Sequence, residues 1–172
     1  MNPLVWVRRL MWMVPIALGV VFIAAGVYMI SEGRSAKDEV RQALAAEKVV
    51  TAEDAAIPSA PVNDAATAEA QAGIIREHSL KTTGGKTYAE LPREDPNRDV
   101  YLKGVTLRTA LNLAVMGFKV SDLVVGMGAF MIVVGASNVF LLAPLLFWAS
   151  DAATEAARLR ERTSIPVPAP TA

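Results

Sequence analysis

The stretch LMWMVPIALGVVFIAAGVYMI, residues 10–30, contains twenty-one residues and no charged side chain. A helix rises about 1.5 Å per residue, so about 20 apolar residues cross the roughly 30 Å of hydrocarbon in a bilayer. The stretch therefore predicts one membrane-spanning helix. A cleaved signal peptide is the alternative, but its apolar core is usually only about 7–15 residues long, and no A-x-A-like site follows here directly.

A second apolar block, LVVGMGAFMIVVGASNVFLLAPLLFWA at residues 123–149, has twenty-seven uncharged residues. This length suits one tilted helix and is too short for two. A third span at residues 111–118 is disfavoured, because that segment is too short and would move the C-terminal arginines across the membrane. The chain is therefore predicted to span the membrane twice, with a kink at Pro144 in the second span.

Basic residues flank both blocks. Arg8 and Arg9 precede the first block, and Arg158, Arg160 and Arg162 follow the second. Because cytoplasmic flanks of membrane helices are enriched in Lys and Arg, both termini are predicted to be cytoplasmic. The expected location is the cytoplasmic (inner) membrane of a bacterial cell envelope, with residues of about 31–106 outside the cytoplasm.

This topology divides the chain into six segments. They are a cytoplasmic N-terminus (1–9), a first transmembrane helix (10–30), an extracytoplasmic hairpin and cap (31–106), a helix leading into the membrane (107–122), a second transmembrane helix (123–149), and a cytoplasmic basic helix with a Pro-rich tail (150–172).

The central segment is expected to extend both spans as an antiparallel helical hairpin that carries a small helical cap. Ala, Glu, Lys and Arg favour helix from residue 31 to about Lys48. Asp64 is suited to cap the N-terminus of an Ala-rich helix, which Gly84 and Gly85 would end. Before the second span, apolar residues recur at helical spacing: Leu107, Leu111, Ala114, Val115 and Phe118. The predicted fold class is an all-α membrane protein.

Composition narrows the functions that are open to the chain. Hydrophobic residues make up 53% of it, and 17 basic side chains balance 17 acidic ones, so no global field indicates a nucleic acid partner. The chain has no cysteine, which excludes disulfides, thiolate nucleophiles, iron–sulfur clusters and Cys-ligated zinc.

The segment EHSLKTTGGKTYAEL, residues 77–91, contains the Gly-Gly-Lys-Thr that ends a phosphate-binding loop. Such a loop also needs a glycine at the position that Leu80 occupies, and its glycines lead into a helix instead of ending one. Nucleotide binding is therefore not expected. The alternatives for Gly84, Gly85, Lys86 and Thr87 are a structural turn and an anion contact for a lipid phosphate or a carboxylate.

The run AEAQAGIIREHSLKTTGGKTYAELPREDPNR, preceded by AEKVVTAEDA and followed by LRTAL, resembles a family of small two-span membrane proteins, mainly from actinobacteria. The resemblance covers residues of about 10–136, and its most specific part is an H-x-L-x-x-TGGKTYAEL motif. It implies the two-span topology and an extracytoplasmic cap, and it implies no activity. The chain departs from the family in its NVFLLAPLLFWA segment and its arginine-rich end.

Members of this family often carry a name that implies an aromatic-ring-opening dioxygenase. Non-haem enzymes of that kind hold iron with two histidines and a carboxylate, whereas this chain has one histidine, His78. The name is therefore interpreted as mistaken. For His78 the alternatives are packing in the cap, with a hydrogen bond to a turn, and a role as a pH-sensitive group or as a ligand to a partner's metal or haem.

Small and polar residues in the two spans indicate helix contacts. Gly19 and Gly26 lie one heptad apart in the first span, and Gly128 and Gly135 share a face of the second. Gly126 presents a different face, which is predicted to meet a partner protein. Asn138 is expected to bond across an interface or to its own helix, and Lys119 and Asp122 are expected to pair with each other.

Together these features predict a non-catalytic accessory or structural subunit of a larger integral membrane complex, with an energy-transducing complex as one candidate. No catalytic, cofactor-binding or metal-binding residue is identified. The expected partners are other integral membrane proteins and lipids. The alternative is a free-standing or homo-oligomeric envelope protein that binds lipid or organises the membrane.

Overall fold

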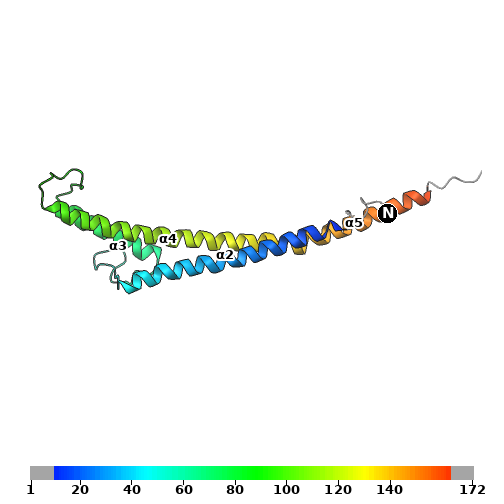
Figure 1. Cartoon of the computed structure of the whole chain (residues 1–172), viewed down its shortest axis with the longest axis horizontal. Helices are drawn as coiled ribbons and strands as arrows, with labels where there is room; N and C mark the ends of the chain where they lie inside the picture. Colours follow the sequence, from blue (N-terminus) through cyan, green and yellow to red (C-terminus); the bar gives the residue numbers. More distant parts are fainter. Residues whose placement is uncertain (1–9, 164–172) are drawn as a thin grey trace, which may run out of the picture. The chain divides into compact units, whose positions relative to one another are not determined.

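A computed structural model of the chain describes the backbone of residues 10–163 and the side chains of residues 10–160. Its elements are α2 (Met13–Ala46), α3 (Ala65–Thr82), α4 (Asn97–Ser137), the π-helix η1 (Asn138–Leu142) and α5 (Ala143–Thr163) (Figure 1). The described residues contain no strand beyond one isolated bridge between Val50 and Pro61, which confirms the all-helical class. The arginines at 8, 9 and 162 and the Pro-rich tail lie outside the described side chains.

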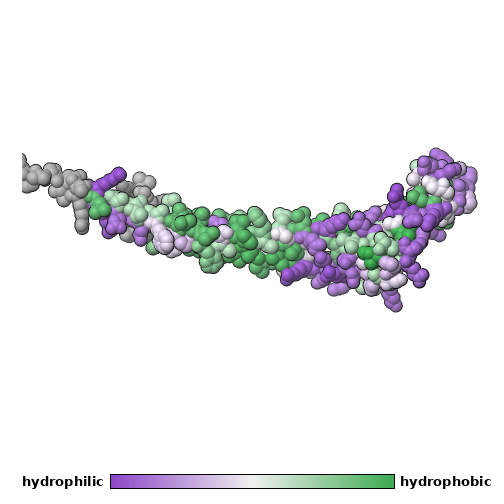
Figure 2. Space-filling view, turned by 180° about the vertical axis from the view of Figure 1, so that it is seen from behind, coloured by the Kyte–Doolittle hydropathy of each residue, from purple (hydrophilic) through white to green (hydrophobic). Residues whose placement is uncertain are grey.

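Two helical segments are long and apolar enough to cross a membrane: α2, and the continuous helical run Asn97–Arg160. Of the most apolar 18-residue stretch in each, only 17% and 11% is buried, so neither is the enclosed core helix of a soluble domain. Figure 2 shows hydrophobic residues gathered over one stretch of the visible surface, with hydrophilic residues gathered mainly beyond that stretch.

The chain forms two compact units, which are described separately. The apolar unit comprises Met1–Tyr28 and Met127–Ala172, and the polar unit comprises Met29–Gly126. Because the two long helices continue through the boundary, α2 and α4 each contribute residues to both units.

In the apolar unit, α2 and α4 run antiparallel and meet through glycines. A Cβ atom added to Gly19 would lie 2.6 Å from the carbonyl oxygen of Gly135, and one added to Gly26 would lie 2.5 Å from that of Gly128. Both distances are too short for a real side chain, so the two backbones approach as closely as only glycine allows.

In the polar unit, α2 and α4 pair in the same register. Gly33 lies seven residues after Gly26, and an added Cβ would lie 3.0 Å from the carbonyl oxygen of Ser121, seven residues before Gly128. Phe118 is fully buried nearby. A small core then joins α3 and the loop before it to the two long helices, through Val62, Ala68, Ala72 and Leu111, with Leu44, Val49, Ile75 and Val115 packed against them.

The ends of α3 are fixed by local sequence. The carboxylate of Asp64 accepts a hydrogen bond from the amide of Thr67, whose side chain reaches back in a capping box, which confirms the predicted N-cap. At the other end, Gly84 (φ 61°) and Gly85 (φ 85°) adopt left-handed conformations. The amide of Gly85 donates to the carbonyl of Leu80 at 2.8 Å, which confirms that these glycines end the helix.

Two helix boundaries differ from the sequence-based ranges. The first long helix ends at Ala46 and not at about Lys48. The second begins at Asn97, ten residues before the predicted lead-in at 107, because the carboxylate of Asp95 accepts a hydrogen bond from the amide of Asn97 (2.9 Å) and Pro96 suits a helix start.

The predicted kink at Pro144 corresponds to a change of helix type. The π-helix η1 directly precedes α5, and the amide of Ala143 donates to the carbonyl of Asn138, five residues back. Proline has no amide hydrogen for the regular ladder, so the turn before Pro144 accommodates the missing bond by widening.

Candidate functional site

His78, on α3, contacts the loop before that helix. Its Nε2 lies 2.7 Å from a carboxylate oxygen of Asp54, and both side chains are about half exposed. The hydrogen bond from His78 lowers the pKa of Asp54 below its ordinary value. The contact becomes an ion pair when the imidazole is protonated. Among the described residues, no three His, Asp or Glu side chains converge in a metal-binding arrangement.

The turn at Gly84–Thr87 already holds an anion from its own chain. The amide and the hydroxyl of Thr87 both donate to the same carboxylate oxygen of Glu90, each at 2.7 Å. The hydrogen bond from the Thr87 amide is the largest cause that lowers the pKa of Glu90, and the nearby Lys86 ammonium adds to it. An external phosphate or carboxylate would have to displace Glu90 from these donors.

Arg98 holds the segment that follows this turn. Its guanidinium stacks over the ring of Tyr88, with 4.1 Å from Cζ to the ring centroid, and donates to the carbonyl of Leu91 at 2.7 Å. Leu91 is buried. Together with the hydrogen bond from the hydroxyl of Thr83 to the carbonyl of Lys86, these contacts make the segment a fixed structural turn.

Gly84→Val is expected to destabilise the polar unit by about 1 kcal/mol or more, because valine is strained at a φ of 61°. Lys86→Ala should be mild, since that side chain is exposed. Thermal unfolding of the purified variants would measure both effects. If the turn were a nucleotide site, Lys86→Ala would have the larger effect: it would abolish a measured nucleotide affinity and leave the fold intact.

The glycines of the long helices fall into two groups. Gly19, Gly26, Gly128 and Gly135 are buried where α2 meets α4, whereas an added Cβ on Gly126 would meet nothing within 4 Å. Asn138 bonds to its own helix, with Nδ2 donating to the carbonyl of Val134 at 2.9 Å. Its Cβ also lies 3.2 Å from where a Gly19 side chain would start, so Asn138 borders the glycine contact.

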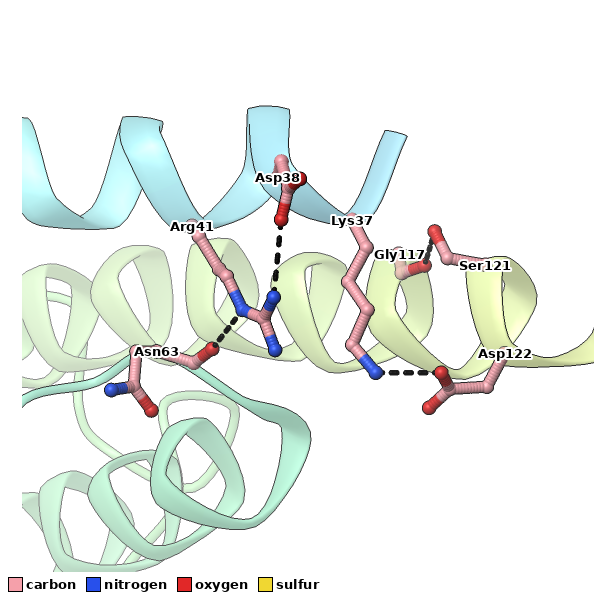
Figure 3. A network of polar contacts seen from close by, with 7 residues as sticks. All are labelled: Lys37, Asp38, Arg41, Asn63, Gly117, Ser121 and Asp122. Carbon is pink, nitrogen blue, oxygen red and sulfur yellow. Dashed lines mark hydrogen bonds and ion pairs between the residues drawn. The ribbon is translucent and has the colours of Figure 1, made fainter. Parts of the chain in front are cut away.

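The predicted pair between Lys119 and Asp122 is wrong. Lys37 on α2 binds Asp122 at 2.6 Å, and Lys119 lies 3.6 Å from the carboxylate of Glu69 on α3. Figure 3 shows Lys37 and Arg41 extending from α2, the first toward Asp122 on α4 and the second toward the backbone oxygen of Asn63. Neighbouring helices thus supply closer partners than the same helix does.

A basic groove lies between α3 and α4 in the polar unit. It is lined by Glu69, Ala72, Gly73, Arg76, Arg108 and Asn112. The described part of the chain offers Arg76 and Arg108 no hydrogen bond or ion pair, while Glu69 is engaged by Lys119. An added Cβ on Gly73 would meet nothing within 4 Å, so the groove is open at that point. Sequence reasoning missed this groove because its two arginines lie 32 positions apart.

A second groove, in the apolar unit, is aromatic. It is lined by Trp12, Ile16, Val139, Ala143, Pro144, Phe147 and Trp148. The rings of Trp12 and Phe147 meet edge to face, with centroids 5.8 Å apart. Trp12 and Trp148 lie near the two ends of the uncharged blocks, where aromatic side chains gather at membrane surfaces.

No family model, curated protein or solved structure matches this chain. The resemblance to actinobacterial two-span proteins therefore stays a prediction.

Proposed function

We propose that this protein is a non-catalytic accessory subunit of a larger integral membrane complex. One observation carries the proposal: α2 and α4 meet through small residues at every seventh position, Gly19 with Gly135 and Gly26 with Gly128. Because small residues fill the contact, the large apolar side chains face outward. They include Val14, Leu18, Val21, Phe130, Val133 and Phe140, all more than 45% exposed.

Such a pair of helices offers a bilayer two kinds of surface. Bulky side chains suit lipid tails, and an open glycine suits close approach by another helix, since van der Waals contact is the main attraction between helices in lipid. Gly126 is that open glycine, because an added Cβ there would have no atom of the described residues within 4 Å.

In this proposal the protein resides in a bacterial cytoplasmic membrane with both termini in the cytoplasm. The polar unit then stands outside the cytoplasm as a helical hairpin with α3 and its loops as a cap. Lys37 and Asp122 form the charged pair closest to the uncharged blocks. They would lie at the extracytoplasmic surface of the cytoplasmic membrane.

Gly126→Leu is expected to leave the protein inserted and folded but to weaken its retention in the complex. A leucine at this position has room within the chain, whereas it would hold a neighbouring helix away. The tagged protein is purified from its native membranes in a mild detergent, and co-purifying proteins are quantified for wild type and variant.

The matched control is Ala24→Leu, which places the same leucine side chain at an exposed small residue on α2. We expect a stoichiometric, heterologous partner with wild type and with Ala24→Leu, and several-fold less of it with Gly126→Leu. Equal recovery with all three proteins would count against a partner on this face. Self-association as the only interaction would instead favour an envelope homo-oligomer.

A further inference from the structure

An exposed apolar stripe runs along α4 in the polar unit. Leu102, Leu113, Met116, Val120 and Leu123 are 47–62% exposed. Thr106 and Thr109 are exposed as well and continue the spacing of three and four residues between the leucines. The buried residues Leu111, Phe118 and Ser121 lie on the opposite face of the helix, so α2 and α3 leave this stripe uncovered.

The stripe has the pattern of a helix-packing seam. Apolar or neutral residues at alternating spacings of three and four form the contact line between two paired helices. From Leu102 to Leu123 the line extends for about 30 Å at about 1.5 Å per residue, and no charged residue interrupts it. Isolated exposed apolar residues are ordinary, but a line of apolar and uncharged residues along one helix face marks an interaction surface.

The basic groove flanks this seam. Arg108 and Asn112 line the groove from α4, and Asn112 is the direct neighbour of Leu113 and lies one turn before Met116. Arg76 faces them from α3. Two guanidinium groups without a partner in the described chain suit a carboxylate or a phosphate, because arginine binds either one through paired hydrogen bonds.

The bilayer surface is too distant to supply the anion. Arg108 precedes Asp122, the last charge before the second uncharged block, by fourteen residues, or about 21 Å of helix. The headgroup layer is only about 5–7 Å thick on each side of the hydrocarbon. A lipid headgroup is therefore not the source of the anion, and the apolar stripe beside the groove favours a protein segment.

A second copy of this chain does not supply the carboxylate either. The acidic residues of α4 are Asp99 and Asp122. Asp122 is bound to Lys37, and Asp99 lies nine residues, or about 13 Å of helix, from Arg108, too far to reach it in a parallel pair of copies. On α3, Glu69 is engaged by Lys119 and Glu77 by Lys81. Two copies paired along the stripe would leave the guanidinium groups of Arg76 and Arg108 unmatched.

We propose that this surface, composed of the apolar stripe and the basic groove beside it, binds an acidic amphipathic helix of a partner protein outside the membrane. The helix places apolar residues along the stripe and an Asp or Glu side chain in the groove between Arg76 and Arg108. The inference rests on the proposed accessory role, because it assigns the contact that would hold the partner outside the bilayer.

The first test uses a photo-crosslinking amino acid at Met116 in the full-length protein in its native cells. We expect a discrete adduct with another protein, whose crosslinked peptide is amphipathic and contains Asp or Glu. The double variant Arg76→Glu, Arg108→Glu should reduce the adduct about tenfold, since repulsion replaces two charge-assisted hydrogen bonds. Arg93→Glu, which reverses an exposed charge in the segment before α4, away from the groove and the stripe, should leave it unchanged.

The second test uses defined probes with the purified protein. A synthetic helical peptide with leucine at every third or fourth position and Glu beside that line should bind about tenfold more tightly than its Lys counterpart. The double variant should remove this preference. Thermal unfolding of the variant establishes that it is folded, and anionic phospholipid vesicles serve as the lipid probe.

Four outcomes would overturn the inference: no adduct at Met116, an adduct with lipid or with a second copy, an adduct unaffected by the double variant, or equal binding of the Glu and Lys peptides. The accessory role is tested independently of this docking site. If a stoichiometric partner still co-purifies and depends on Gly126 while the Met116 adduct is missing, the accessory role stands and only the docking site is wrong.

Discussion

Replacing Gly26 with leucine is expected to separate α2 from α4 in the apolar unit and to destabilise the protein by about 3 kcal/mol or more. An added Cβ alone would lie 2.5 Å from the carbonyl oxygen of Gly128 and 2.7 Å from the side chain of Ile132. A side chain has room to rotate away, but a backbone carbonyl moves only with its helix. Thermal unfolding in detergent, followed by circular dichroism, measures the loss.

Gly126→Leu is the matched control for this substitution. It adds the same side chain to a long apolar helix, at a position where nothing lies within 4 Å. Its unfolding should stay within about 0.5 kcal/mol of wild type. If Gly26→Leu unfolded at the same temperature as wild type and Gly126→Leu, the close glycine contact would not be a source of stability.

The sequence shows the seven-residue spacing of the glycines, but it does not show how far along the two helices the glycine contact extends. Gly19 and Gly26 lie in an uncharged block, which marks them as helix-contact residues, whereas Gly33 follows Ser31 and Glu32 and carries no such signal. The structure places Gly33 against the carbonyl of Ser121 in the same register. Helix packing depends on side-chain size at each turn, so the close contact continues past the end of the uncharged block.

The polar contacts of the polar unit were less predictable. Spacing along one helix suggested Lys119 with Asp122, but each binds a residue of a different helix. Asp54 could not be assigned to His78, because the two lie 24 positions apart and meet only through the fold of the loop. Local signals served better, as with the cap at Asp64, whose partner Thr67 is three residues away.

The Thr87 contact with Glu90 was also local, and its spacing of three residues was available in the sequence. The Gly-Gly-Lys-Thr letters leave a structural turn and an external anion as alternatives, and they do not single out Glu90 as the group that the Thr87 donors bind. A carboxylate within the same turn satisfies these donors at no cost in binding entropy, so an internal partner has the advantage over a free ligand.

The remaining prediction concerns topology and has an all-or-none readout. The natural chain has no cysteine, so a single introduced cysteine is a unique label. Lys86→Cys and Ala157→Cys both replace exposed residues, one in the turn after α3 and the other on α5. Thr83, although close to Lys86, is buried and would report accessibility poorly.

A membrane-impermeant thiol reagent added to intact cells or spheroplasts should label Lys86→Cys and leave Ala157→Cys unlabelled. Both variants should react fully once detergent opens the membrane, which controls for local accessibility. The expectation follows from the arginines at 158 and 160, because basic residues that flank a membrane helix usually stay in the cytoplasm. Labelling of Ala157→Cys in intact cells would place α5 outside the cytoplasm. The helical run from α4 to α5 would then not cross the membrane once into the cytoplasm, and the two-span topology would be wrong.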